Sequence, residues 1–324
     1  MSCNEKMWAV LVHLGTNLWF DEGNTKGVSE EERGKVWKEP ASASLRFDRA
    51  TFDSLLLKFR DKGINTIIID VAEGMRYESH PELSVEGSWS REEMSEALNK
   101  MREMGFEVIP KLNFSSTHDV WLGEYSRMLS TSIYYKVVRD IIEEVAEVFK
   151  PKYIHIGMDE ENYPLQEKYD YVVVRQNDLW WHDLYYYNEC VLSVGARAMM
   201  WSDYARHKLD EFIEKCPRSI VQCVWYYFND YREDADEMHR IRIAPIKAFE
   251  ANGFDQLPIG SIEYVEDCLV GLVEYCAKNI SDEHLLGFGN TSWAATTPQW
   301  ESFIEKMADV NEKAKEKYQQ TVKS

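Results

Sequence analysis

Apolar and polar positions alternate in blocks along the whole chain. Short apolar runs rich in β-branched residues are each followed by a longer segment of helical periodicity, which makes eight such units. The pattern predicts strands at 8–14, 66–71, 107–112, 153–157, 196–201, 219–225, 256–260 (the weakest) and 286–293. It predicts helices at 49–62, 91–104, 133–149, 178–192, 208–216, 235–251, 265–279 and 298–318.

This alternation predicts an α/β fold, a single (β/α)8 TIM barrel over residues 1–324. A chain of 324 residues, 44% of them hydrophobic, is enough for one large core. An open, doubly wound sheet is the alternative, but no GxGxxG follows the first strand, where Gly15 stands alone. The long irregular stretches 16–45 and 113–132 follow the first and third strands, so we expect them at the C-terminal face, where barrel enzymes place their active sites.

Charge and composition limit the partners. The chain has 56 acidic and 37 basic residues, a net charge of -19, and no basic stretch that would bind nucleic acid. The first apolar run, 7–14, is too short for a membrane span or an export signal, so the chain as written predicts a cytoplasmic protein. Export or a lipid anchor is the alternative if a signal before Cys3 was removed. The six cysteines show no CxxC spacing and are expected to be free thiols.

Aromatic and polar residues gather where the predicted strands end. Eleven Trp and eighteen Tyr exceed what the core needs, and such rings serve either as stacking platforms for sugars or as fillers between barrel and helices. In a barrel the strand ends converge, so we expect one shared cleft with Asp70, Asn113, Asp159, Trp201, Trp225 and Trp293 on the same face. The strand-end candidates are His13, Asp70 with Glu73 and Arg76, Lys111 with Asn113, His155 through Glu160, Trp201 with Asp203, Trp225 with Tyr226, and Trp293.

The fourth strand leads directly into the adjacent carboxylates Asp159 and Glu160. Neighbouring residues at a strand end point in different directions, so the pair can reach two sides of one sugar. Paired carboxylates of this kind carry out glycoside hydrolysis. The alternative is that the acidic run is an ordinary start of the next helix, where negative charge favours the helix dipole.

The segment His155-Ile156-Gly157-Met158-Asp159-Glu160 resembles the H-x-G-G-D-E signature of glycoside hydrolase family 20, the β-N-acetylhexosaminidases, with Met158 in place of the second glycine. Val108-Ile109-Pro110-Lys111-Leu112-Asn113 with His118 downstream is similar to the family's third-strand V-I-P-E-I-D and its histidine. Met200-Trp201-Ser202-Asp203 resembles the fifth-strand Trp-Asp-Glu region. Trp225 and Trp293 fall where the family has tryptophans on its sixth and eighth strands.

The resemblance implies a retaining, substrate-assisted removal of a 2-acetamido sugar (GlcNAc or GalNAc), with no cofactor and no catalytic metal. Glu160 would be the general acid and then the base, and Asp159 would stabilise the acetamido group. The tryptophans Trp201, Trp225 and Trp293 would wall the acetamido pocket. The remaining substrate-binding candidates are His13, Asp70, Arg76, Asn113, His118, His155, Asp203 and Tyr226.

The chain also departs from the family pattern, which implies a divergent relative without the usual N-terminal accessory domain. An arginine that follows the family's first strand is replaced by the His13-to-Asn17 segment, and the third-strand acids become Lys111 and Asn113. The seventh-strand Tyr-x-Asp has no clear counterpart, although Tyr226 or Tyr227 could substitute for its tyrosine.

Two other classes of function remain as alternatives. A metal-dependent hydrolase could gather His13, His118, His155, Asp159 and Asp203 around one ion, although the first strand lacks the usual H-x-H pair. A carbohydrate-binding barrel without catalytic activity would keep the aromatic cleft. Intact Asp159 and Glu160 favour the enzyme over that second alternative.

Overall fold

The computed structural model describes residues 5–21, 35–162, 166, 172–173 and 175–323. Within these ranges eight parallel strands form one sheet in the order β6-β5-β4-β3-β2-β1-β8-β7. The strands are β1 (Met7–His13), β2 (Thr66–Asp70), β3 (Glu107–Lys111), β4 (Tyr153–His155), β5 (Arg197–Trp201), β6 (Val221–Cys223), β7 (Ile259–Ser261) and β8 (Gly287–Thr291).

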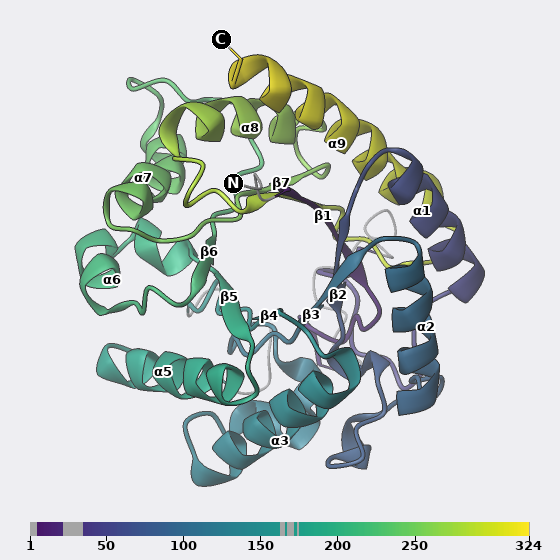
Figure 1. The fold of residues 1–324 in the computed structure, drawn as a ribbon. Helices are drawn as coiled ribbons and strands as arrows, with labels where there is room; N and C mark the ends of the chain where they lie inside the picture. Colours follow the sequence, from purple (N-terminus) through teal and green to yellow (C-terminus); the bar gives the residue numbers. More distant parts are fainter. Residues whose placement is uncertain (1–4, 22–34, 163–165, 167–171, 174, 324) are drawn as a thin grey trace.

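Helices surround the sheet on the outside, as Figure 1 shows. They are α1 (Arg49–Asp61), α2 (Arg91–Glu103), α3 (Ser132–Phe149), α5 (Asp178–Ser193), α6 (Leu209–Lys215), α7 (Glu237–Ala251), α8 (Cys268–Asn279) and α9 (Glu301–Thr321). Short 3-10 helices lie in the connections: η2 (Ala72–Gly74), η3 (Pro81–Leu83), η4 (Val120–Arg127) and η5 (Asp203–Arg206). The (β/α)8 prediction is confirmed, and the open-sheet alternative is wrong.

The two ends of the sheet meet between β6 and β7, which closes the barrel. The backbone bridges Gln222 to Gln256 and Trp225 to Ile259 there, in the same parallel sense as the rest of the sheet. Strand β6 is shorter than the predicted strand over 219–225, and β7 is shorter than the predicted strand over 256–260 and begins later. The reason is that only isolated bridges pair the two strands at this seam.

The barrel interior is an apolar layer of inward-facing side chains. It comprises Ala9, Leu11, Ile68, Ile109, Met199, Trp201, Val221, Cys223, Leu257 and Ile259, all buried. A second buried layer, polar and charged, lies one inward position further along the first four strands and consists of His13, Asp70, Lys111 and His155. The barrel is thus filled by side chains, and the layer nearest the C-terminal face is ionic.

Two further sequence expectations concern cysteines and membranes. The cysteines Cys190, Cys216, Cys223, Cys268 and Cys276 are free thiols, as expected, while Cys3 lies outside the described residues. No helix in the described ranges has the length and apolar character needed to cross a membrane.

Candidate active site

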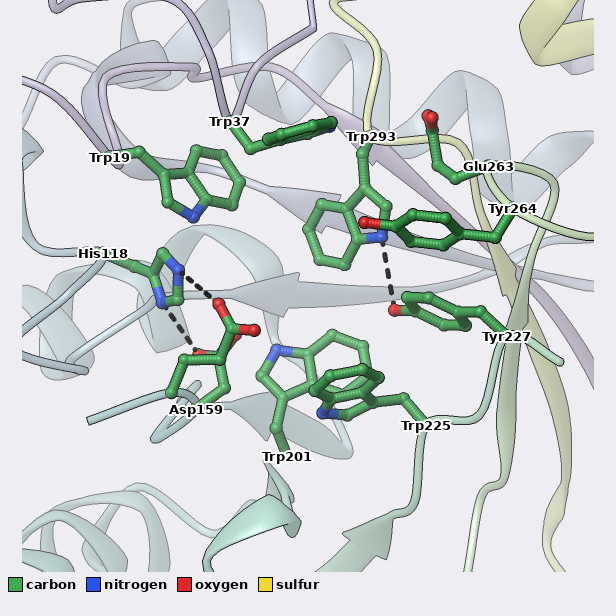
Figure 2. A pocket seen from close by; sticks show the side chains of 11 residues that line it. Trp19, Trp37, His118, Asp159, Trp201, Trp225, Tyr227, Glu263, Tyr264 and Trp293 are labelled. Atoms are coloured by element: carbon green, nitrogen blue, oxygen red, sulfur yellow. Dashed lines mark hydrogen bonds and ion pairs between the residues drawn. The ribbon is translucent and has the colours of Figure 1, made fainter. Parts of the chain in front are cut away.

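A pocket of about 280 Å³ opens at the C-terminal face of the barrel, shown in Figure 2. Every strand except β2 contributes to it, through the strand end itself or through the loop that follows. The lining residues are Trp19 and Trp37 after β1, His118 after β3, Asp159 and Glu160 after β4, Trp201 at the end of β5, Trp225 and Tyr227 after β6, Glu263 and Tyr264 after β7, and Trp293 after β8.

The acid pair lies in a loop whose backbone is largely left-handed. Strand β4 ends at His155, earlier than the predicted residue 157, and Gly157, Met158 and Glu160 have φ values of 76°, 75° and 55°. The different directions of Asp159 and Glu160 therefore come from this loop and not from strand pleating. Left-handed backbone costs energy for residues other than glycine, so the surrounding contacts must hold it in place.

Contacts from three sides hold this loop. The Ser115 and Thr117 hydroxyls donate to the Asp159 carbonyl, the latter at 3.1 Å. The Asp203 carboxylate accepts from the Glu160 backbone N–H at 2.9 Å. At Gly157 an added Cβ would overlap the Asn113 amide, so only glycine fits there.

A buried arginine holds the far end of the same loop. The Arg175 guanidinium pairs with the carboxylate of Glu161, reaches the Met158 sulfur at 3.8 Å, and bonds the Phe114 carbonyl at 2.9 Å. Met158 occupies the place of the family's second glycine, and its buried side chain packs against this arginine.

His118 connects the two acids. Its Nδ1 lies 3.2 Å from Asp159 Oδ1, and its Nε2 lies 3.5 Å from Glu160 Oε2. Burial lowers the pKa of His118, but the carboxylates of Asp159 and Glu160 outweigh burial and raise that pKa to about 9. Burial likewise raises the pKa of Asp159, but His118, Lys111 and Asn113 together bring it below the ordinary range. Near neutral pH the pair is therefore an imidazolium beside a carboxylate.

The two acids differ in exposure. The Asp159 side chain is 10% exposed and the Glu160 side chain 37%. Asn113 donates to Asp159 at 3.0 Å from below, which fixes the carboxylate inside the pocket. Asp159 is therefore the buried carboxylate of the pair, and Glu160 is the more exposed one, which faces the opening of the pocket.

Indole and phenol rings form most of the remaining wall. The Trp293 Nε1–H donates to the Tyr227 hydroxyl at 3.2 Å, and the Arg206 guanidinium stacks 3.6 Å above the centre of the Trp225 ring. The Nε1–H of Trp201 is buried without a hydrogen-bond partner among the described residues, and Figure 2 shows it directed into the pocket. The pocket thus combines stacking surfaces with one unpaired donor.

The structure brings together only part of the predicted site. Residues that line the pocket are His118, Asp159, Glu160, Trp201, Trp225 and Trp293. Asn113 and Asp203 lie just behind the acids and bond them directly. The six residues expected on one face all lie at the C-terminal ends of the strands, as the sequence predicted.

Three other candidates belong to the buried ionic layer and do not line the pocket. Asp70 is paired with Lys111 at 2.6 Å and with His13 at 3.3 Å. Burial lowers the pKa of His13, and it lowers the pKa of His155 to about 3, so both imidazoles stay neutral. Instead, the two imidazole rings pack against tryptophans that line the pocket. The His13 ring centre lies 5.5 Å from that of Trp293, and the His155 ring centre lies 4.5 Å from that of Trp201.

Two further candidates point elsewhere. Tyr226 is buried in the core. Its hydroxyl donates to the Asp230 carbonyl and is hydrogen-bonded to the His239 imidazole. Arg76 is exposed, and its guanidinium donates to the Ser88 carbonyl at 3.4 Å. Of the two tyrosines considered as a substitute for the seventh-strand tyrosine, Tyr227 is the one that lines the pocket.

The sequence did not single out four lining residues: Trp19, Trp37, Glu263 and Tyr264. Trp19 and Trp37 come from the long loop after β1, whose residues 22–34 lie outside the described ranges. The length of this loop was the one feature of the sequence that pointed to Trp19 and Trp37. The Glu263 carboxylate pairs with Lys35 at 2.8 Å, which ties the same loop to the one after β7.

A metal site finds no support among the described residues, where no group of three or more His, Cys, Asp or Glu side chains could hold an ion. Of the residues that the metal-dependent alternative required, His13 and His155 lie in the buried ionic layer, whereas Asp159 lines the pocket. The donor set assumed for that alternative is therefore not assembled in the described structure.

Fold and site together define a (β/α)8 barrel with an adjacent Asp–Glu pair in an aromatic pocket. The model for the glycosyl hydrolase family 20 catalytic domain matches residues 94–246, a stretch that includes both acids. The chain is related to glycoside hydrolase family 20. A search of curated protein sequences found no significant match.

Solved structures of that family have the same fold. The β-N-acetylhexosaminidase from Streptomyces coelicolor A3(2) superposes with a TM-score of 0.62 at 12% identity, over 94% of this chain and 63% of that one. The Bacteroides fragilis β-N-acetylhexosaminidase gives 0.61 at 13%, over 95% and 65%. A mutant Streptomyces plicatus β-hexosaminidase in complex with its product GlcNAc gives 0.61 at 12%, over 99% and 69%. The chain thus spans about two thirds of the length of these proteins.

Proposed function

We propose that this protein is a retaining glycoside hydrolase that removes a terminal 2-acetamido sugar, GlcNAc or GalNAc, from a glycan. The observation that carries the proposal is the adjacent pair Asp159 and Glu160, bridged by His118, inside a pocket of about 280 Å³ walled by indoles. A pocket of this size suits one sugar ring, and its aromatic walls suit stacking on that ring.

In the proposed reaction the acetamido oxygen of the substrate attacks the anomeric carbon. The bond from that carbon to the glycosidic oxygen breaks, and Glu160 gives its proton to the departing oxygen. Water then adds to the anomeric carbon of the cyclic oxazolinium ion, Glu160 takes a proton from the water, and the ring reopens to the free sugar. The acetamido oxygen bonds to the face of the anomeric carbon opposite the leaving group, and water then adds from the original face, so two inversions retain the configuration.

Asp159 is suited to the charge that develops in this reaction. It is buried, ionised near neutral pH and fixed by Asn113 and His118, so it needs no reorganisation when the acetamido nitrogen becomes positive. The more exposed Glu160 faces the opening, where the leaving group must depart. The unpaired Trp201 Nε1–H is a further donor for a polar atom of the sugar.

The test compares two variants on aryl 2-acetamido glycosides of graded leaving-group acidity. Glu160→Gln is expected to cripple turnover of poor leaving groups and to spare good ones, which depart without a proton. Asp159→Asn is expected to slow all of them alike, by on the order of a hundredfold or more. Glu124→Gln is the control, because it removes an exposed carboxylate that does not line the pocket. Equal sensitivity of Glu160→Gln to every leaving group would overturn the assignment.

A further inference from the structure

We propose that Glu73 is a positioning residue for the sugar pocket: its buried carboxylate fixes the start of the loop after β1 and thereby the Trp19 ring in the pocket wall. The inference rests on the proposed function, because the position of the wall matters through the sugar that it contacts. Glu73 itself does not line the pocket.

Glu73 is a buried carboxylate that bonds the backbone of the loop after β1. The residue lies in η2, shortly after β2, and is 1% exposed. Its Oε1 accepts from the backbone N–H groups of Thr16 at 2.7 Å and Asn17 at 3.1 Å, and its Oε2 accepts from Asn17 at 3.1 Å. Burial of a carboxylate is costly unless it is hydrogen-bonded, so these bonds stabilise both Glu73 and the loop segment that donates them.

The loop is built to approach Glu73 closely. At Gly15 an added Cβ would lie 2.7 Å from Glu73 Oε2 and 2.6 Å from the Val71 carbonyl oxygen, so only glycine fits there. The Asn17 side chain then donates to the Ser42 carbonyl and accepts from the Ser42 N–H, both at 2.9 Å. Glu73 therefore fixes the outgoing part of the loop, and Asn17 ties the returning part to it.

Trp19 lies two residues beyond this contact and lines the pocket. Its ring packs in a T-shaped arrangement against His118, with 4.9 Å between ring centres, and against Trp293 at 5.8 Å. Figure 2 shows Trp19 next to His118. A loop that must be ordered when the sugar binds costs affinity, whereas an indole already in place does not. Loss of the Glu73 contact should therefore weaken sugar binding and leave the two acids in position.

The experiment measures steady-state kinetics on 4-nitrophenyl glycosides of GlcNAc and GalNAc. For Glu73→Ala we expect KM to rise about tenfold, the size of one hydrogen bond to a charged group, with kcat within about threefold of wild type. Glu73→Gln should keep KM within about twofold of wild type, because its amide oxygen can replace Oε1 and accept from both N–H groups. Glu73→Asp withdraws the carboxylate by one methylene, so it should raise KM as alanine does, and it replaces the alanine variant if that one does not fold.

Glu144→Ala is the matched control. Glu144 is also buried and accepts from the backbone N–H groups of Glu78 at 2.6 Å and Ser79 at 3.0 Å, but it lies on α3 and does not line the pocket. This variant should lose stability without a change in KM. A KM that stays at the wild-type value in Glu73→Ala, or that rises equally in Glu144→Ala, would overturn the inference. A Glu73→Gln variant as impaired as Glu73→Ala would overturn the hydrogen bonds as its basis.

Hydrogen exchange separates failure of this inference from failure of the proposed function. Amide exchange in peptides that cover residues 15–20 is followed by mass spectrometry in wild type, Glu73→Ala and Glu144→Ala. We expect exchange there to be faster in Glu73→Ala alone, because only that variant removes the acceptor of the Thr16 and Asn17 N–H groups. If wild type cleaves neither glycoside, the glycosidase proposal fails and exchange decides the role of Glu73: faster exchange in Glu73→Ala alone supports it, and an unchanged rate overturns it.

Discussion

Replacing His118 with alanine should destabilise the protein in a pH-dependent way. His118 is buried between Asp159 and Glu160, and its removal leaves Asp159 in the pocket without its nearest cation. Raising the pKa of His118 from 6.5 to about 9 corresponds to roughly 3 kcal/mol, at about 1.36 kcal/mol per pH unit. Breaking a buried ion pair by removing one partner costs a similar amount, about 3–5 kcal/mol.

The direction with pH follows from the raised pKa. A histidine with a higher pKa in the folded than in the unfolded state contributes its full stability below pH 6.5 and loses it as the pH rises through about 9. We therefore expect His118→Ala to lower the free energy of unfolding by about 3 kcal/mol at pH 6 and by clearly less at pH 9.5. Urea denaturation of wild type and variant at the two pH values measures this.

His155→Ala is the matched control, since His155 is equally buried but its pKa is lowered to about 3, so it is neutral at both pH values. Its cost should change in the opposite direction and be smaller at pH 6 by about 1 kcal/mol, because the unfolded imidazole, with an ordinary pKa near 6.5, is mostly protonated there while the folded one is neutral. If the cost of His118→Ala does not fall between pH 6 and pH 9.5, then His118 is not the imidazolium that the site requires, and the reasoning is refuted.

The other expectations concern the catalytic loop and metal dependence. Gly157→Ala should abolish activity and cost at least about 1 kcal/mol more than Gly253→Ala in urea denaturation, because both glycines have positive φ but only the Cβ at 157 overlaps a neighbour, the Asn113 amide. A similar cost for the two variants would contradict the steric argument. Chelation by EDTA should leave activity unchanged, because the proposed reaction uses only carboxylates and the substrate's own amide. Loss of activity that a divalent ion restores would contradict that mechanism.

The sequence predicted the barrel because periodicity survives in every unit. Strands β1, β2 and β3 begin and end within one residue of the predicted bounds, since each has a centre of consecutive buried apolar residues. Strand β4 is shorter than predicted because the chain turns left-handed from Gly157 onward, and periodicity carries no signal for that turn.

The candidate site was predicted less completely. The position of a residue at a strand end does not show whether its side chain lines the pocket or is buried beneath it. His13, Asp70 and His155 close their strands as Trp201 does, but they are buried beneath the pocket, where Asp70 pairs with His13 and with Lys111. The loop residues Trp37 and Tyr264 follow no periodic pattern. Only the folded chain places them in the same pocket as the acids.

The measurement that tests the central claim most directly compares one aryl leaving group on two sugars. The wild-type protein is assayed with the aryl 2-acetamido glycoside and with the matching 2-hydroxy glycoside. If the acetamido oxygen is the nucleophile, kcat/KM should be higher for the 2-acetamido sugar by at least about a hundredfold, since a positioned intramolecular group replaces an external one. Equal rates on the two sugars would contradict participation of the acetamido group and would leave Asp159 without its proposed role.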